Sequence, residues 1–171
     1  VGLVDATAYL MRDGGTQRSS AEEVDELLDF LASSVRSGST GSTINVSLNC
    51  LADNFEESFD IFQDAIQQPR FQESRLALYQ DDYLEEMKQR NDRPSTILSM
   101  EYGKLLYGDS FLGNEPTESS INSIAHEDLT KTHRQIISPN NLLLSVSGDF
   151  NGDEMVVFLE DRFGSWAGQT H

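Results

Sequence analysis

VGLVDATAYLMRDGGT, residues 1–16, is the stretch of sequence that decides the fold. Its apolar residues recur at the spacing of one broad helix face: Leu3, Val4, Ala6, Ala8, Leu10 and Met11. The pair Gly14-Gly15 follows them, and glycine at such a position is typical of the end of a helix. The stretch therefore predicts an amphipathic helix that packs its apolar side on a core.

The size and charge of the chain limit the class of protein. Its 171 residues suit one domain with a core of its own, and no apolar run is long enough for a membrane-spanning helix. The formal net charge is −17, from 29 acidic and 12 basic residues, which leaves no basic footprint for nucleic acid. We therefore expect no nucleic-acid partner and no membrane insertion.

One cysteine, Cys50, excludes an internal disulfide framework. It ends an alternating run with Ile44, Val46 and Leu48, so we expect a packed thiol on the inner face of a strand. The chain does not begin with Met, which predicts that it is cut from a longer protein. The sequence leaves the compartment open, with the bacterial periplasm and cytoplasm as alternatives.

Periodicity predicts further helices and two strands. Helices are expected at about 20–35, capped by Ser19 or Ser20, and at about 53–68, 72–91, 93–106, 126–137 and 153–163, with a short turn near Ile121. Residues 43–51 and 142–147 are expected to be strands, and 37–42 a flexible turn. In the helix at 93–106 the residues expected inside are Ile97, Met100, Leu105 and Leu106.

Several stretches in order resemble the insulinase/pitrilysin family of zinc metallopeptidases. They are GLVDATAYLMRDGGT, QRSSAEEVDELLDFL, INVSLNCLADNFEESFDIFQDAIQQPRF, KLLYGDSF and HEDLTKTHRQIISPNNLLLSVSGDF. The resemblance implies an α+β fold, in which helices pack on one side of an antiparallel sheet. It also implies one partial domain over residues 1–165, with a tail at 166–171 and with the first strands of the sheet preceding this sequence.

The family carries an H-x-x-E-H motif in its opening helix. The matching positions here are Asp5, Ala8 and Tyr9, which provide neither the two imidazoles of a zinc site nor a general base. By resemblance the third ligand position falls on Glu86, with Glu85 as the alternative. We therefore expect no catalytic residues and no zinc. Asp5 with Glu86 as a weak site for a hard cation is the alternative to plain surface carboxylates.

Two other groups of residues imitate metal sites. His126 and His133 are seven residues apart on one predicted helix, about 10 Å along its axis, too far to share an ion. Asp149, Asn151, Asp153 and Glu160 imitate the ligands of a calcium loop, but Glu154 replaces the glycine that such a loop requires. We interpret the second group as a helix cap.

The function predicted from this resemblance is a non-catalytic, peptidase-like domain. It would complete a peptide-binding chamber with a zinc-bearing subunit or half, and would hold unfolded or extended peptides through residues that the sequence does not identify. Open sheet edges predict self-association. The alternatives are a structural or scaffold protein of the same fold, and a peptidase with an unrecognised site.

Overall fold

The computed structural model describes residues 2–40, 43–108, 110 and 113–166, and the chain divides into two compact units. The first unit spans residues 1–132 and the second spans 133–171. The single domain expected over 1–165 stays a prediction. Of the predicted tail, residues 167–171 lie outside the described residues, as do positions 41–42 of the predicted turn.

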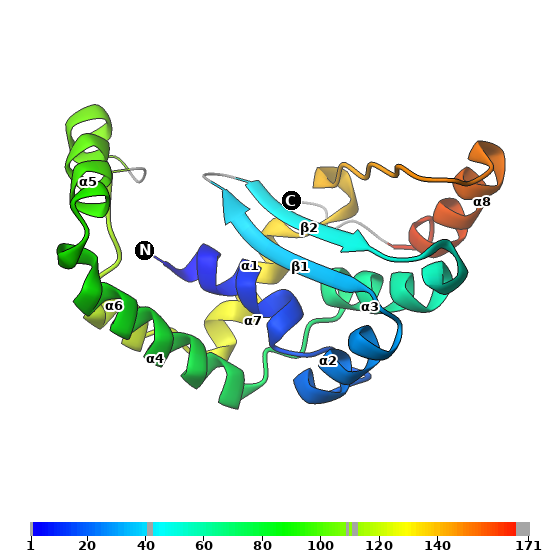
Figure 1. The fold of residues 1–171 in the computed structure, drawn as a ribbon, viewed down its shortest axis with the longest axis horizontal. Helices are drawn as coiled ribbons and strands as arrows, with labels where there is room; N and C mark the ends of the chain where they lie inside the picture. The colour runs from blue at the N-terminus through cyan, green and yellow to red at the C-terminus, as the bar shows by residue number, and fades with distance from the viewer. Residues whose placement is uncertain (1, 41–42, 109, 111–112, 167–171) are drawn as a thin grey trace. The chain divides into compact units, whose positions relative to one another are not determined.

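The first unit contains most of the secondary structure (Figure 1). In chain order its elements are α1 (Leu3–Asp13), α2 (Ala21–Phe30), β1 (Ser34–Thr40), β2 (Thr43–Asn49), the short 3-10 helix η1 (Ala52–Asn54), α3 (Phe55–Gln67), α4 (Glu73–Gln89), η2 (Arg90–Asp92), α5 (Pro94–Tyr107) and α6 (Glu118–Asn122). Helix α7 (His126–Ile136) crosses the boundary, and the second unit continues with η3 (Pro139–Asn141) and α8 (Gly152–Phe163).

Helix α1 is the centre of the first unit, and it contacts β1, α3 and α4. Its inward residues are fully buried, as the apolar stripe predicts: Ala6, Ala8, Leu10 and Met11. The helix ends at the predicted glycines, where Gly14 N donates to the carbonyl of Leu10 over 2.9 Å. Gly15 has a φ of 73°, which glycine adopts without strain, and a Cβ there would lie 2.7 Å from the Ala21 nitrogen.

Strands β1 and β2 form an antiparallel hairpin, with Ser34 opposite Asn49 and Thr40 opposite Thr43. Helices α1 and α2 pack against β1, and α3 packs against β2. This arrangement confirms an α+β fold with helices on an antiparallel sheet. On β2 the predicted alternation is also confirmed, because Ile44, Val46 and Leu48 are half-buried while the residues between them are exposed. Cys50 is half-buried rather than fully enclosed.

The helix predicted at 20–35 and the turn predicted at 37–42 are wrong in part. Helix α2 ends at Phe30, and residues 34–40 are strand β1. Of the seven residues in β1 only Val35 is both apolar and buried, so its own sequence has little strand periodicity. The strand exists because its backbone pairs with β2. Gly41-Ser42 between the two strands is the available signal, since such a pair is typical of a two-residue hairpin.

Two further expectations are corrected. In α5 no residue is buried, and Leu105 is 83% exposed, so the inward placement of Ile97, Leu105 and Leu106 is wrong. The apolar residues of α5 surround the helix instead of forming one face. Residues 142–147 are not a strand, because a strand needs a hydrogen-bonded neighbour and these residues have none within the described chain.

Candidate functional site

The three positions that the resemblance assigns to the zinc site lie on α1 and have different environments. Asp5 is exposed, and its carboxylate accepts a hydrogen bond from the Ser39 hydroxyl of β1. Ala8 is fully buried. Tyr9 is 43% exposed, and its carbonyl accepts a hydrogen bond of 3.2 Å from the Ser37 hydroxyl. Strand β1 is thus attached to α1 at two of the three positions that the resemblance assigns to the motif.

The two candidates for the third ligand position, on α4, differ in what surrounds them. Glu85 is bound at the surface, where its carboxylate accepts from Lys88 Nζ at 3.2 Å and from Gln89 Nε2 at 3.2 Å. The charge of Glu86 instead raises the pKa of Tyr79 and Tyr83, and the charge of Asp5 has the same effect. Glu86 follows Tyr83 by one helical turn, so it is the α4 carboxylate on the face whose rings meet Tyr9 of α1.

Three aromatic rings, Tyr9, Tyr79 and Tyr83, connect α1 to α4, and we call them the tyrosine row. The ring centroids of Tyr9 and Tyr79 are 5.3 Å apart with a 37° tilt, and those of Tyr79 and Tyr83 are 5.8 Å apart with a 40° tilt. Such tilted pairs are favourable contacts between aromatic quadrupoles. The two α4 tyrosines are half-buried.

Burial raises the pKa of all three phenols in the tyrosine row. Negative charge adds to this effect: Asp13 and Asp82 raise the pKa of Tyr9, while Asp5 and Glu86 raise the pKa of both Tyr79 and Tyr83. The three phenols are consequently neutral at physiological pH, and each keeps a hydroxyl hydrogen that it can donate.

This set of donors does not fit zinc. Protein zinc sites use imidazole, thiolate and carboxylate, and a neutral phenol is a poor replacement. Asp5 is bound to Ser39, and the ring of Tyr9 packs on Tyr79. Across the described residues, no three histidine, cysteine, aspartate or glutamate side chains gather closely enough to hold a metal ion. The absence of zinc from this chain stays a prediction.

The tyrosine row is the feature that sequence reasoning missed. Sequence reasoning assigned no role at the site to Tyr79 or Tyr83. The signal was nonetheless available, since Tyr79, Tyr83 and Glu86 recur at the spacing of one helix face. What the sequence did not show is that this face meets Tyr9.

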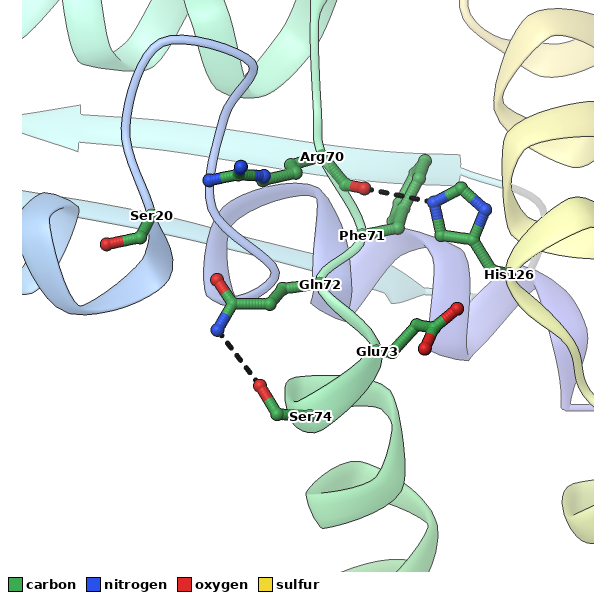
Figure 2. Close-up of a pocket in the computed structure, with 7 residues that line it drawn as sticks. All are labelled: Ser20, Arg70, Phe71, Gln72, Glu73, Ser74 and His126. Atoms are coloured by element: carbon green, nitrogen blue, oxygen red, sulfur yellow. Dashed lines mark hydrogen bonds between the residues drawn. The ribbon is translucent and has the colours of Figure 1, made fainter.

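A second polar feature is an open depression of about 590 Å³, shown in Figure 2. It is lined by Ser20, Arg70, Phe71, Gln72, Glu73, Ser74 and His126. Its wall is the chain before α4, which lies beside the end of α1 through Arg70 N to Gly15 O and Gln72 N to Gly14 O, both 2.9 Å.

Residues in this wall are held by several contacts. His126 Nε2 is 3.1 Å from the carbonyl oxygen of Arg70, and Gln72 Nε2 donates to Ser74 Oγ at 2.9 Å. Phe71 has a φ of 53°, and its buried ring makes an edge contact with the His126 ring. Left-handed backbone at a bulky residue is strained and is kept only where its surroundings impose it.

The other sequence candidates have structural roles. The side chain of Asn151 accepts hydrogen bonds from Asp153 N at 2.9 Å and from Glu154 N at 3.3 Å, so the prediction of a helix cap is confirmed. Ser20 forms a capping box with Glu23, which decides between the two serines predicted to cap α2. Among the described residues, no helix is long and apolar enough to cross a membrane.

Two protein-family models match the sequence of this chain. The model described as insulinase (peptidase family M16) matches residues 10–115, more than half of the chain. The chain belongs to the insulinase family. A second model of the family, described as the peptidase M16 inactive domain, matches residues 123–171.

Individual relatives are distant in sequence and close in fold. An uncharacterized zinc protease of Mycobacterium leprae is 23% identical over 152 residues, covering 88% of this chain and 34% of the relative. A crystal structure of a protease from Helicobacter pylori superposes with a TM-score of 0.84 at 19% identity, covering 99% of this chain and 42% of that one.

A more distant structure has a protein bound to it. The ferredoxin protease FusC in complex with Arabidopsis ferredoxin superposes with a TM-score of 0.75 at 11% identity, covering 98% of this chain and 18% of that one. These structural likenesses concern the fold. This chain spans about a third of the length of the curated relatives it matches.

Proposed function

We propose that this chain is a non-catalytic, peptidase-like domain that completes a peptide-binding chamber with a zinc-bearing subunit or half. The observation that carries the proposal is the state of the former motif on α1. Ala8 is fully buried where the family has its general base, and Asp5 and Tyr9 are engaged with Ser39 and Tyr79. A zinc peptidase activates water with a metal and a base, and these positions provide neither.

The family match supports the proposal in two ways. Part of the chain, residues 123–171, matches the model described as the inactive domain. The chain also covers only about a third of its curated relatives, so a complete chamber would need further polypeptide. The zinc and the base would come from that polypeptide.

Strand β1 is the element best placed to hold a peptide. One of its edges pairs with β2, and in the described part of the chain no other strand pairs with it. Its hydroxyls Ser37 and Ser39 attach it to α1 beside the tyrosine row. An extended peptide added to the open edge of β1 would gain backbone hydrogen bonds while lying next to the former zinc site. The complex of FusC with ferredoxin is a precedent for a bound protein on this fold.

The test combines this chain with a subunit or half of the same protein that carries an intact H-x-x-E-H motif. We expect background hydrolysis of unfolded protein by this chain alone, formation of a complex on mixing, and faster cleavage by the mixture than by the zinc-bearing part alone. A chain that forms no complex and adds no activity would favour the scaffold alternative.

Peptide binding by strand addition has its own control. A peptide N-methylated at alternate residues along one edge cannot donate backbone hydrogen bonds there, whereas its side chains are unchanged. We expect the unmodified peptide to bind and the methylated one to lose most of its affinity. Equal binding of the two peptides would contradict strand addition.

A further inference from the structure

We propose that the tyrosine row, with Asp5 and Glu86, binds a cationic side chain of the peptide, the ammonium of lysine or the guanidinium of arginine. This inference rests on the proposed function, since the peptide would lie along β1 beside α1. It assigns to the former zinc site a ligand that no longer requires a metal.

The ring geometry suits a cation. Tyr9, Tyr79 and Tyr83 form a continuous run of rings across α1 and α4, with centroid spacings of 5.3 and 5.8 Å. Tyr9 is 43% exposed, so a part of this run is open to a ligand. The face of an aromatic ring attracts lysine and arginine through its quadrupole, and tyrosine ranks with the stronger rings.

The charges around the row favour a cation as well. Asp5 precedes Tyr9 by one turn of α1, and Glu86 follows Tyr83 by one turn of α4, so each helix brings a carboxylate to the face that carries the row. In agreement, both charges raise the pKa of Tyr79 and Tyr83. In the described part of the chain, neither carboxylate forms an ion pair. Both can therefore interact with an arriving positive charge without giving up an ion pair, and Asp5 keeps a second carboxylate oxygen besides the one that accepts from Ser39.

The nearby arginines Arg12 and Arg75 are engaged with other carboxylates, although their charges also lower the pKa of Tyr9. Arg12 is paired with Asp25 at 2.6 Å, and Arg75 is paired with Asp25 at 3.0 Å and with Glu22 at 3.2 Å. The charge of Arg90 lowers the pKa of Tyr83, whereas the charges of Asp5, Glu115 and Glu86 raise it. At Tyr83, three carboxylates therefore act against one arginine.

An organic cation fits these groups better than a metal ion does. Two carboxylates are too few for the six to eight oxygen ligands that calcium takes, and neutral phenols are poor metal ligands. Aromatic faces contribute nothing to calcium coordination, whereas they stabilise ammonium and guanidinium groups. The same phenols, being protonated, add no charge of their own.

The experiment compares two extended peptides that differ at one residue, lysine in one and acetyl-lysine in the other. The expected result is tighter binding of the lysine peptide by the wild-type chain. Glu86→Gln should reduce this preference by about two- to fivefold, the range of one solvent-exposed charge pair. Glu85→Gln is the matched control, because Glu85 is adjacent, equally charged and bound to Lys88 and Gln89.

A second pair of variants tests the ring. Tyr9→Phe keeps the aromatic face and should keep the preference for lysine. Tyr9→Leu removes the face and should weaken the preference by about two- to fivefold. Because Tyr9 is partly exposed, both variants should fold, which circular dichroism checks. A preference that depends on Glu86 and not on the ring would overturn the inference, because carboxylates alone would then be binding.

The outcomes separate this inference from the proposed function. Equal binding of the two peptides overturns the cation site and leaves the peptide-binding role intact. If neither peptide binds, the peptide-binding role fails, and titration with N-acetyl-lysine amide, followed by tyrosine fluorescence, decides the site alone. A response lost in Glu86→Gln and kept in Glu85→Gln supports the site, and no response overturns it.

Discussion

Replacing Ala8 by glutamate would restore the residue that the family uses as its base, and we expect the change to destabilise the fold. Ala8 is fully buried on the core side of α1. A carboxyl group at this position would be removed from water, and neither a zinc ion nor an arginine would compensate its charge. Burial of this kind raises the pKa of a carboxyl by up to about 3–5 units.

The size of the effect follows from linkage between proton binding and folding. We take a pKa of about 4.3 for the glutamate in the unfolded chain and about 7 in the folded chain. The folded state then holds the proton more tightly, so stability falls as the pH rises from about 4 to about 7 and is level above that. The charge contributes a loss of about 1 kcal/mol at pH 5 and about 3.5 kcal/mol at pH 8.

The assay is urea unfolding of wild type, Ala8→Glu and Ala8→Gln at both pH values. Glutamine has nearly the same size and no charge, so it carries the packing cost of the larger side chain without the pH dependence. The difference between the two variants should grow by about 2.5 kcal/mol from pH 5 to pH 8. If the two variants lose equal stability at both pH values, position 8 is not the dry core position that the structure describes.

Three further predictions concern the site and its support. After washing with chelator and dialysis against zinc, elemental analysis should find no stoichiometric metal, because Asp5, Ala8 and Tyr9 replace the ligands and base; one tightly held zinc per chain would refute this. In an alkaline titration followed by phenolate absorbance, Tyr9, Tyr79 and Tyr83 should ionise above the ordinary tyrosine pKa, and five unshifted tyrosines would contradict the buried row. Ser20→Ala should lose about 1 kcal/mol of stability in urea unfolding because it removes the cap of α2, whereas Ser19→Ala, beside it, should lose little; equal losses would argue against the capping box.

The sequence by itself determined the elements whose information is local. The helical stripe and terminal glycines of α1 predicted its position and its end. The alternation in β2 gave its inner side. The prediction that this helix holds no zinc also comes from the sequence, because Asp5, Ala8 and Tyr9 stand at the spacing of the motif that the resemblance implies. In each case a short stretch contains the whole pattern.

Only the tertiary structure decided the features that depend on a partner distant in sequence. Strand β1 owes its hydrogen bonds to β2, and the apolar residues at 142–147 form no strand because no neighbour pairs with them in the described chain. The sequence alone does not distinguish Glu85 from Glu86. In the structure Glu85 binds Lys88, whereas Glu86 follows Tyr83 by one turn of α4 and its charge raises the pKa of Tyr79 and Tyr83. The row itself exists only where α1 meets α4, since ring contacts and charge depend on distances in space, which the order of residues does not contain.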